Sequence, residues 1–367
     1  ASYLDISELD ADDGRRIDQA QPSLRLRAVW EIPQIQLVEE PIEAVGDEVK
    51  IPETARIIDV SGSVIMPGII DPYHAISISG ATATPVSRTA IINGRRVTLT
   101  SPSSSSVSFA RVGENFYPFS FRGRVLQRTG VTHINLVANG YGQAALIRNT
   151  PKKPESMLID SDGVMYASIS NRSTSINVIR SGLASGARPT SSSSRTGSVS
   201  PAQALWKEVR EGKRRLIVNA NNAAGILHLL ELLESHKKIK LTLIATGPNI
   251  YRAMDALRRT KPSLIVQPTI DTEPNSTVRI CVPRLVNEAG MKMAFSLSFS
   301  QSRLTASQDT PLFPVAQMVR VGLPRETALR ALTLVPAELL GLEKTHGSIS
   351  KGKQANLLVF DGDPLDP

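Results

Sequence analysis

From residue 200 onward, apolar side chains recur alternately at the spacing of helices and of strands. Strands are predicted over 215–220, 241–245, 264–267 and 292–297. Helices are predicted over 223–235, 250–259, 283–289, 311–321, 324–333 and 336–340. Successive strands begin about 25 residues apart, which is the spacing of βα units in a parallel sheet or barrel. This half of the chain therefore predicts an α/β fold.

Capping residues support two of these helices. Ser200 is a suitable N-cap, Pro201 suits the first helical position, and Gln203 completes a capping box. A further helix is therefore predicted to begin at Pro201. Gly341 follows the last apolar run and is expected to end the final helix.

The first half of the chain reads as short strands and loops. Apolar and polar residues alternate over 32–58, and 132–138 is an apolar strand candidate. Met157 to Ile169 is predicted to form a hairpin, because the turn dipeptide Asp162-Gly163 separates two apolar runs. Serine dominates 101–108 and is frequent in 185–200, so both stretches are expected to be loops.

The two ends of the chain are expected to meet. Residues 355–361 read as a strand that needs a partner, and the N-terminal segment is rich in strand candidates. This organisation predicts an acidic arm over residues 1–28 and a small composite β-domain over 29–64 plus 343–367. A barrel-like body is predicted over 65–342. The composite domain is expected to be a small β-sandwich built from both chain ends.

Composition excludes several classes of protein. Apolar residues make up 41% and charged residues 21% of 367, which is typical of a folded globular chain rather than a disordered one. No run of apolar residues is long enough to predict a membrane-spanning helix. Cys281 is the single cysteine, so an intramolecular disulfide or a cysteine-rich zinc site is excluded. Its apolar neighbours, Ile280 and Val282, argue against a catalytic thiol.

The net charge of +8 is unevenly distributed, because residues 1–50 are strongly acidic. A basic body attracts acidic partners, but its arginines occur in pairs such as Arg95-Arg96 and only 4% of residues are aromatic. A nucleic-acid surface is therefore not expected. The chain begins at Ala1. Removal of the initiator methionine and cleavage of a signal peptide both fit this start, and export to the periplasm or cell envelope is the favoured expectation.

Four stretches carry a resemblance to a known family, and they occur in that family's order along the chain. They are Ile58 to Asp71, Gly130 to Leu146, Gly322 to Leu342, and Gly347 to Leu365. They resemble the amidohydrolase superfamily and, within it, the imidazolonepropionase-related branch. The resemblance implies a (β/α)8 TIM barrel beside a small β-domain. Residues 150–200 are short for two complete βα units, so irregularity is expected around strands 3 and 4.

The same resemblance implies a metal-dependent hydrolase of C–N bonds, with zinc or another divalent cation. Imidazole and carboxylate ligands at the carboxyl ends of the strands would hold the metal, which lowers the pKa of a bound water. The strand 1 motif of the family is Asp-x-His-x-His. Matching it to Asp71 places Tyr73 and Ala75 at the two histidine positions, with His74 between them on the opposite face.

The remaining ligand positions are also changed. By the same resemblance they fall on Asn219, Thr246 and Ser298, with Ser296 or Leu297 replacing Ser298 if the register slips. Amide and hydroxyl groups are poor ligands for zinc and related ions. Asp71, His74 and His133 are the residues with ligand or acid–base chemistry that lie near these positions. The sequence therefore predicts no bound metal or other cofactor.

Two hypotheses about function follow. In the first, the chain is a non-catalytic subunit, a pseudoenzyme with a structural or assembly role. It would form a homo- or hetero-oligomer, for example with a catalytically active amidohydrolase paralogue. In the alternative, it is a divergent hydrolase of non-peptide C–N bonds, similar to imidazolonepropionase, that uses Asp71, His74 or His133. Whether the chain is an enzyme stays open at this point, because the fold alone does not confer the activity.

Overall fold

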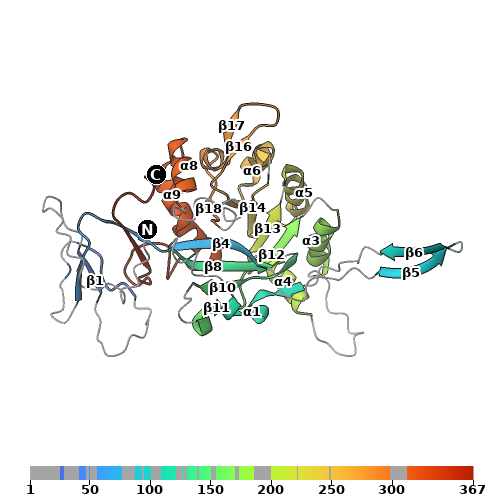
Figure 1. Ribbon diagram of the computed structural model, residues 1–367, viewed down its shortest axis with the longest axis horizontal. Coiled ribbons are helices and arrows are strands. Elements are labelled where there is room, and N and C mark those ends of the chain that lie inside the picture. The colour runs from blue at the N-terminus through green and yellow to red at the C-terminus, as the bar shows by residue number, and fades with distance from the viewer. Residues whose placement is uncertain are drawn as a thin grey trace.

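The structure is a computed structural model that describes most of the chain after residue 130 (Figure 1). It describes residues 25–28, 41–46, 49, 56–76, 87–92, 95–100, 109–120, 126, 130–138, 140–149, 154–169, 173–185, 200–220, 222–247, 249–297 and 312–366. The two serine-rich stretches, apart from Ser185 and Ser200, and the expected ligand position Ser298 lie outside these residues.

Five parallel strands form the centre of the larger sheet. In spatial order they are β12 (Met165–Ile169), β13 (Leu216–Ala220), β14 (Leu241–Ala245), β15 (Ser263–Val266) and β18 (Met293–Phe295). The last four confirm the strands predicted after residue 200. Nearly all of their apolar side chains are buried, as expected for strands that are covered on both faces.

A second parallel pair comes from the first half of the chain. Strand β4 (Ile69–Ile76) runs beside β8 (Val131–Ala138), and all eight residues of β8 are buried. The strand predicted over 132–138 is thereby confirmed. Asn135 Nδ2 donates a hydrogen bond to the Pro72 carbonyl oxygen at 3.0 Å, which ties the two strands together through a side chain.

An antiparallel segment joins the two sheets. Strands β9 (Tyr141–Gln143) and β10 (Ala145–Arg148) are separated by Ala144 alone. Strand β10 pairs antiparallel with β8, and β9 pairs antiparallel with β12. The strands therefore follow one another as in a barrel, in the order β4, β8, β9–β10, β12, β13, β14, β15, β18. The segment β9–β10 differs from a barrel strand because it runs antiparallel to both of its neighbours, β8 and β12. No backbone ladder joins β18 to β4 within the described residues, so the fold is a mixed α/β fold whose sheet does not close.

Helices cover these strands, and α3, α5, α9 and α10 each pack against a strand (Figure 1). The longer helices are α3 (Ser173–Ser185), α4 (Pro201–Arg210), α5 (Ala223–Leu233), α6 (Met254–Thr260), α7 (Val282–Glu288), α8 (Phe313–Arg320), α9 (Arg325–Leu332) and α10 (Leu334–Leu340). The helices predicted after residue 200 are confirmed, with η4 (Ile250–Ala253) forming the first turn before α6. Helix α3 was not predicted, because its serine, asparagine and glycine residues weaken the helical pattern.

The predicted caps form as expected. Gln203 N donates to Ser200 Oγ at 3.3 Å, and Ser200 N donates to Gln203 Oε1 at 3.2 Å, which completes the capping box of α4. Gly341 ends α10 with φ of +76°, a left-handed conformation that glycine adopts without strain. Of the described helices, none has the length and apolar character needed to cross a membrane.

The hairpin predicted over Met157 to Ile169 is wrong. Strand β11 (Leu158–Asp160) does not pair with β12. Instead, β11 pairs antiparallel with β10, and β12 pairs antiparallel with β9, so both run along the same neighbouring segment. Asp162-Gly163 therefore shifts the chain sideways between two strands that continue in one direction, instead of reversing it.

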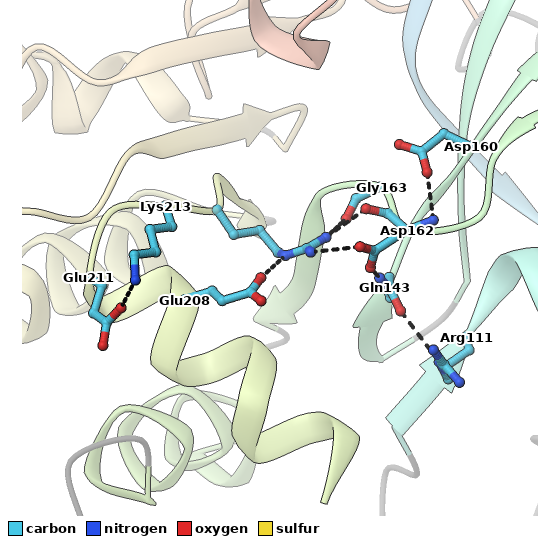
Figure 2. Close-up of polar contacts among 9 residues, drawn as sticks. Arg111, Gln143, Asp160, Asp162, Gly163, Glu208, Glu211 and Lys213 are labelled. Atoms are coloured by element: carbon cyan, nitrogen blue, oxygen red, sulfur yellow. Dashed lines mark hydrogen bonds and ion pairs between the residues drawn. The ribbon is translucent and has the colours of Figure 1, made fainter.

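Side chains from other elements hold this dipeptide in place (Figure 2). Arg214 donates to the carbonyl oxygens of Asp162 and Gly163 and to Asp162 Oδ2, and its Nε donates to Glu208 Oε2 of α4 at 2.6 Å. Gln143 Nε2 donates to Asp162 Oδ1. These long-range contacts decide the local geometry, which the turn dipeptide alone could not indicate.

The chain ends also meet in the structure. Strand β19 (Leu357–Phe360) pairs antiparallel with β3 (Val64–Pro67), and Gly68 N donates to the Asn356 carbonyl oxygen at 2.8 Å. Residues 25–28, which were expected within an irregular arm, form β1 (Arg25–Ala28) and pair with β2 (Arg56–Asp59). The division into an arm, a composite β-domain and a body stays a prediction.

The other described elements are short. They are β5 (Ser87–Ile92), β6 (Arg95–Thr100), β7 (Phe109–Arg111), α1 (Val112–Asn115), η2 (Pro118–Ser120), η3 (Pro154–Ser156), β16 (Ile270–Thr272) and β17 (Arg279–Cys281). β5 pairs with β6 and β16 pairs with β17, in each case as an antiparallel hairpin.

Candidate functional site

Two expected ligand positions meet near the carboxyl ends of their strands. Tyr73 lies in β4 and Asn219 lies in β13, 146 residues later in the chain. Asn219 Nδ2 donates a hydrogen bond to the Tyr73 hydroxyl oxygen at 3.0 Å. The fold thus brings together two positions that the resemblance placed in one site. The side chains bind each other there.

A second buried contact links β4 to the residue after β18. Asp71 is fully buried, and Ser296 Oγ lies 2.9 Å from Asp71 Oδ1 and 2.8 Å from the Tyr73 carbonyl oxygen. Tyr73 N also donates to Asp71 Oδ1, at 3.3 Å. Asp71, Tyr73, Asn219 and Ser296 are called the carboxyl-end cluster below. Ser296 bridges the edge at which the backbone ladder stays open.

His74 lies close to this cluster, although simple alternation along a strand places it on the other face. Its Nδ1 is 3.7 Å from Asp71 Oδ2. The pairing of β4 with β8 shifts register between Asp71 and His74, where Pro72 supplies no backbone N–H. This bulge breaks the alternation of side chains between Asp71 and His74 and explains their approach, while the expectation that His74 lies opposite Tyr73 and Ala75 stays a prediction.

The other expected ligand positions contribute less to the described site. Thr246 directly follows β14 and is half-buried, and Ala75 near the end of β4 is exposed. Ser298 lies outside the described residues, but its expected alternative, Ser296, belongs to the cluster. The correspondence of these positions to metal ligands of active relatives stays a prediction.

His133 contacts a different part of the molecule. It is buried near the amino end of β8, and its ring meets the ring of His346 edge to face, with centroids 4.2 Å apart. His133 Nδ1 lies 3.1 Å from Thr132 Oγ1, and His346 Nδ1 lies 2.8 Å from Thr345 Oγ1. His133 and His346 are called the histidine pair below. No local pattern in the sequence joined them, because 213 positions separate them.

Burial keeps both tyrosines near the cluster in the neutral form. Burial raises the pKa of Tyr73; the Asn219 hydrogen bond opposes this shift and the Asp71 carboxylate reinforces it. Burial also raises the pKa of Tyr166 in β12, and the Tyr73 phenol adds to the shift. Tyr166 was not predicted as a site residue, since a tyrosine in an apolar strand usually packs in the core. Neither phenol is a ready anionic ligand or a base at neutral pH.

The residues of the carboxyl-end cluster do not fit a divalent metal of the kind the resemblance implies. Zinc and its neighbours select imidazole, thiolate or carboxylate ligands, and a catalytic site holds three of them or more. Asp71 is the one carboxylate of the cluster, and His74 is the one imidazole beside it. In the described part of the chain, no three His, Cys, Asp or Glu side chains come together as such a site.

Cys281 is half-buried and its thiol lies 3.7 Å from the sulfur of Met318. Burial raises the pKa of Cys281, which keeps the thiol protonated at neutral pH. This agrees with the sequence-based view that the thiol is not a nucleophile.

Comparison with known proteins gives three results. A profile of the amidohydrolase family matches residues 317–366. An imidazolonepropionase from Flavobacterium johnsoniae is 33% identical over 72 residues, which cover 20% of this chain and 17% of that relative. The crystal structure of an amidohydrolase from Thermotoga maritima is similar with a TM-score of 0.67 and 19% identity, over 90% of each chain.

These matches cover different shares of the chain. The structural similarity extends over most of the chain and shows the fold, whereas the sequence matches cover short segments. Together they support the amidohydrolase superfamily and a likeness to imidazolonepropionase in sequence.

Proposed function

We propose that this chain is an amidohydrolase-fold protein without hydrolytic activity, which serves as a structural subunit of an assembly. The observation that carries the proposal is the hydrogen bond between Tyr73 and Asn219. The resemblance implies that both positions hold metal ligands in active relatives. Here each side chain uses the other as its polar partner.

The chemistry of the cluster supports this proposal. A metal-dependent hydrolase needs ligands that leave one coordination position open for water, and a base to accept the water's proton. The phenol of Tyr73 stays protonated, and the amide of Asn219 is neutral. Neither group supplies the charge that stabilises a divalent cation in a protein site.

Asp71 is also committed to structural contacts. Its Oδ1 accepts from Ser296 Oγ and from Tyr73 N, which joins β4 to the end of β18. We propose that this contact stands in for the missing backbone ladder and completes a barrel of the (β/α)8 type. A carboxylate with these two donors stabilises the fold and is poorly placed to activate a water.

The assembly part of the proposal rests on the outer surface of the fold, which does not depend on catalytic activity. This surface can pair with a second copy or with an active, metal-bearing paralogue. Export to the periplasm or cell envelope and the absence of a cofactor remain part of this proposal.

The alternative is a divergent hydrolase of non-peptide C–N bonds. The proximity of His74 Nδ1 to Asp71 Oδ2 favours it, because an acid–imidazole pair can act in proton transfer. Ser296 could serve as a nucleophile if a general base, such as an imidazole, accepted its proton. Its hydroxyl instead lies within hydrogen-bond distance of Asp71 Oδ1 and the Tyr73 carbonyl oxygen. His133 belongs to the histidine pair and adds nothing to this arrangement.

Metal content tests the proposal. The purified chain would be incubated with zinc, manganese and ferrous iron, desalted, and analysed by inductively coupled plasma mass spectrometry. We expect far less than one equivalent of any metal. About one tightly bound equivalent would overturn the proposal, since that is the stoichiometry of a catalytic site. Loss of that metal in His74→Gln, with retention in the surface control His228→Gln, would establish the alternative.

The assembly is tested separately by chemical cross-linking in extracts of the source organism, followed by mass spectrometry. Cross-links to a second copy or to a histidine-bearing paralogue are expected. A chain that cross-links to neither and sediments as a monomer would overturn the structural-subunit proposal.

A further inference from the structure

A cavity lies apart from the carboxyl-end cluster, among helix α6, strand β17 and helix α7. Its volume is about 300 Å³, at the lower end of the range for small-molecule pockets. It shares no lining residue with the carboxyl-end cluster or the histidine pair. In Figure 1, α6 and the β16–β17 hairpin lie together at the top of the view.

The wall of this cavity is strongly basic. Arg258, Arg279 and Arg284 line it, with Asp255 as the one carboxylate among the lining residues. Arg258 Nη1 lies 3.3 Å from Asp255 Oδ1, but the Asp255 side chain is 87% exposed, so water screens this pair. For Arg279, no acidic partner occurs among the described residues.

Arg284 is held in position from outside the cavity. Its Nε lies 3.2 Å from Glu288 Oε1, and its Nη1 donates to the Val321 carbonyl oxygen at 3.3 Å. Both contacts leave donors of the guanidinium unused, since arginine carries five N–H groups. These contacts orient the Arg284 guanidinium group, and its remaining N–H donors stay available to a ligand.

The remaining wall is apolar. Met254 is buried and Cys281 is half-buried, and both line the cavity. The Cys281 thiol contacts Met318 Sδ and stays neutral because burial raises its pKa. An apolar wall opposite guanidinium groups suits a molecule with one charged end and one apolar end.

We propose that this cavity binds a small organic anion. Its carboxylate or phosphate group would bind the guanidinium groups of Arg279 and Arg284, and its apolar part would pack on Met254 and Cys281. Planar guanidinium groups bind both kinds of oxyanion through paired N–H donors. The site would bind its ligand without any chemistry at the carboxyl-end cluster.

The single cysteine of the chain reports on the cavity directly. The rate of Cys281 alkylation by N-ethylmaleimide would be measured while phenyl phosphate is titrated, with sodium chloride used to hold ionic strength constant. Phenyl phosphate is expected to slow alkylation in a saturable way. Phenol is expected to leave the rate unchanged, and inorganic phosphate to act only at higher concentration.

Arg279→Gln is the matched test, because this side chain is exposed and its replacement should not affect folding. Its protection midpoint is expected to rise about tenfold, as the loss of a charge-assisted hydrogen bond predicts. Arg259→Gln, on the same helix as Arg258 but outside the cavity wall, should behave as the wild type. No protection by phenyl phosphate, equal protection by phenol, or an unchanged midpoint in Arg279→Gln would each overturn the proposal.

Discussion

The carboxyl-end cluster includes two residues of β4 and the histidine pair includes one residue of the neighbouring strand β8, but their polar groups differ. In the carboxyl-end cluster, a carboxylate, a hydroxyl, a phenol and an amide form hydrogen bonds with one another. In the histidine pair, two imidazoles contact each other near the amino end of β8, and their Nε2 atoms have no hydrogen-bond partner among the described residues. The two imidazoles of the histidine pair therefore lie away from the strand ends where catalysis usually takes place, whereas His74 is the imidazole beside the carboxyl-end cluster.

The charges around the histidine pair explain what it can do. Burial lowers the pKa of His133 well below its usual value, and the neighbouring His346 and Arg148 lower it further. Burial lowers the pKa of His346 to about 4, with Arg148 and Lys353 adding to the shift. Both rings are therefore neutral at physiological pH. The pair packs the segment after α10 against β8, so its role in the fold is structural.

The largest expected effect is a loss of stability in acid that originates in the histidine pair. The folded pKa of each ring lies below the unfolded value near 6.5, so the unfolded chain binds more protons in between. The free energy of unfolding should therefore fall as the pH drops below about 6.5, for His346 down to its folded pKa of about 4, with a slope of at most about 1.4 kcal/mol per pH unit for one ring. Urea denaturation at a series of pH values measures this slope.

His133→Phe is the control for that measurement, because it keeps an aromatic ring beside His346 and removes one titrating group. The pH slope should decrease by at most about 1.4 kcal/mol per unit, because one titrating ring is removed, and the slope is compared separately from any constant change in stability at pH 8. An unchanged slope would show that carboxylates elsewhere cause the acid sensitivity. The histidine pair and the carboxyl-end cluster would then differ in geometry but not in pH dependence.

Much of the fold could be predicted because its signals are local. The capping box at Ser200, the glycine at the end of α10 and the apolar strand β8 are each encoded within a few residues. The direction of the chain at Asp162-Gly163 could not be predicted. It depends on Arg214 and Gln143, which come from other elements.

The same distinction applies to the candidate site. The positions of Tyr73 and Asn219 could be inferred from the family resemblance, and the fold brings them together. Ser296 was inferred as an alternative to Ser298, but its hydrogen bond with Asp71 could not be inferred, since 225 residues separate the two. The bulge that turns His74 toward Asp71 also depends on pairing with a distant strand.

The next largest effect is expected for Asp71→Ala in the carboxyl-end cluster. The change removes the acceptor of the buried Tyr73 N–H and one of the two acceptors of the Ser296 hydroxyl, which keeps the Tyr73 carbonyl oxygen, at a cost of about 3 kcal/mol in the free energy of unfolding. Ser296→Ala removes only a donor and should cost about 1 kcal/mol. In the double variant the costs should not add, because both changes remove the same hydrogen bond. Full additivity would mean that this bond does not join β4 to the end of β18.

The smallest effect is expected for Tyr73→Phe, and the stability of its double variant with Asn219→Leu separates a structural cluster from an altered active site. The change removes the acceptor of the Asn219 Nδ2 hydrogen bond and should lower the free energy of unfolding by about 1 kcal/mol. If the phenol is retained only for this bond, Tyr73→Phe/Asn219→Leu should recover most of that loss, because no unpaired polar group then remains. A cluster kept for chemistry carries polar groups that the fold does not need, and the double variant would then be more stable than the wild type. Thermal unfolding of the single and double variants, together with Asn219→Leu to complete the cycle, distinguishes these outcomes.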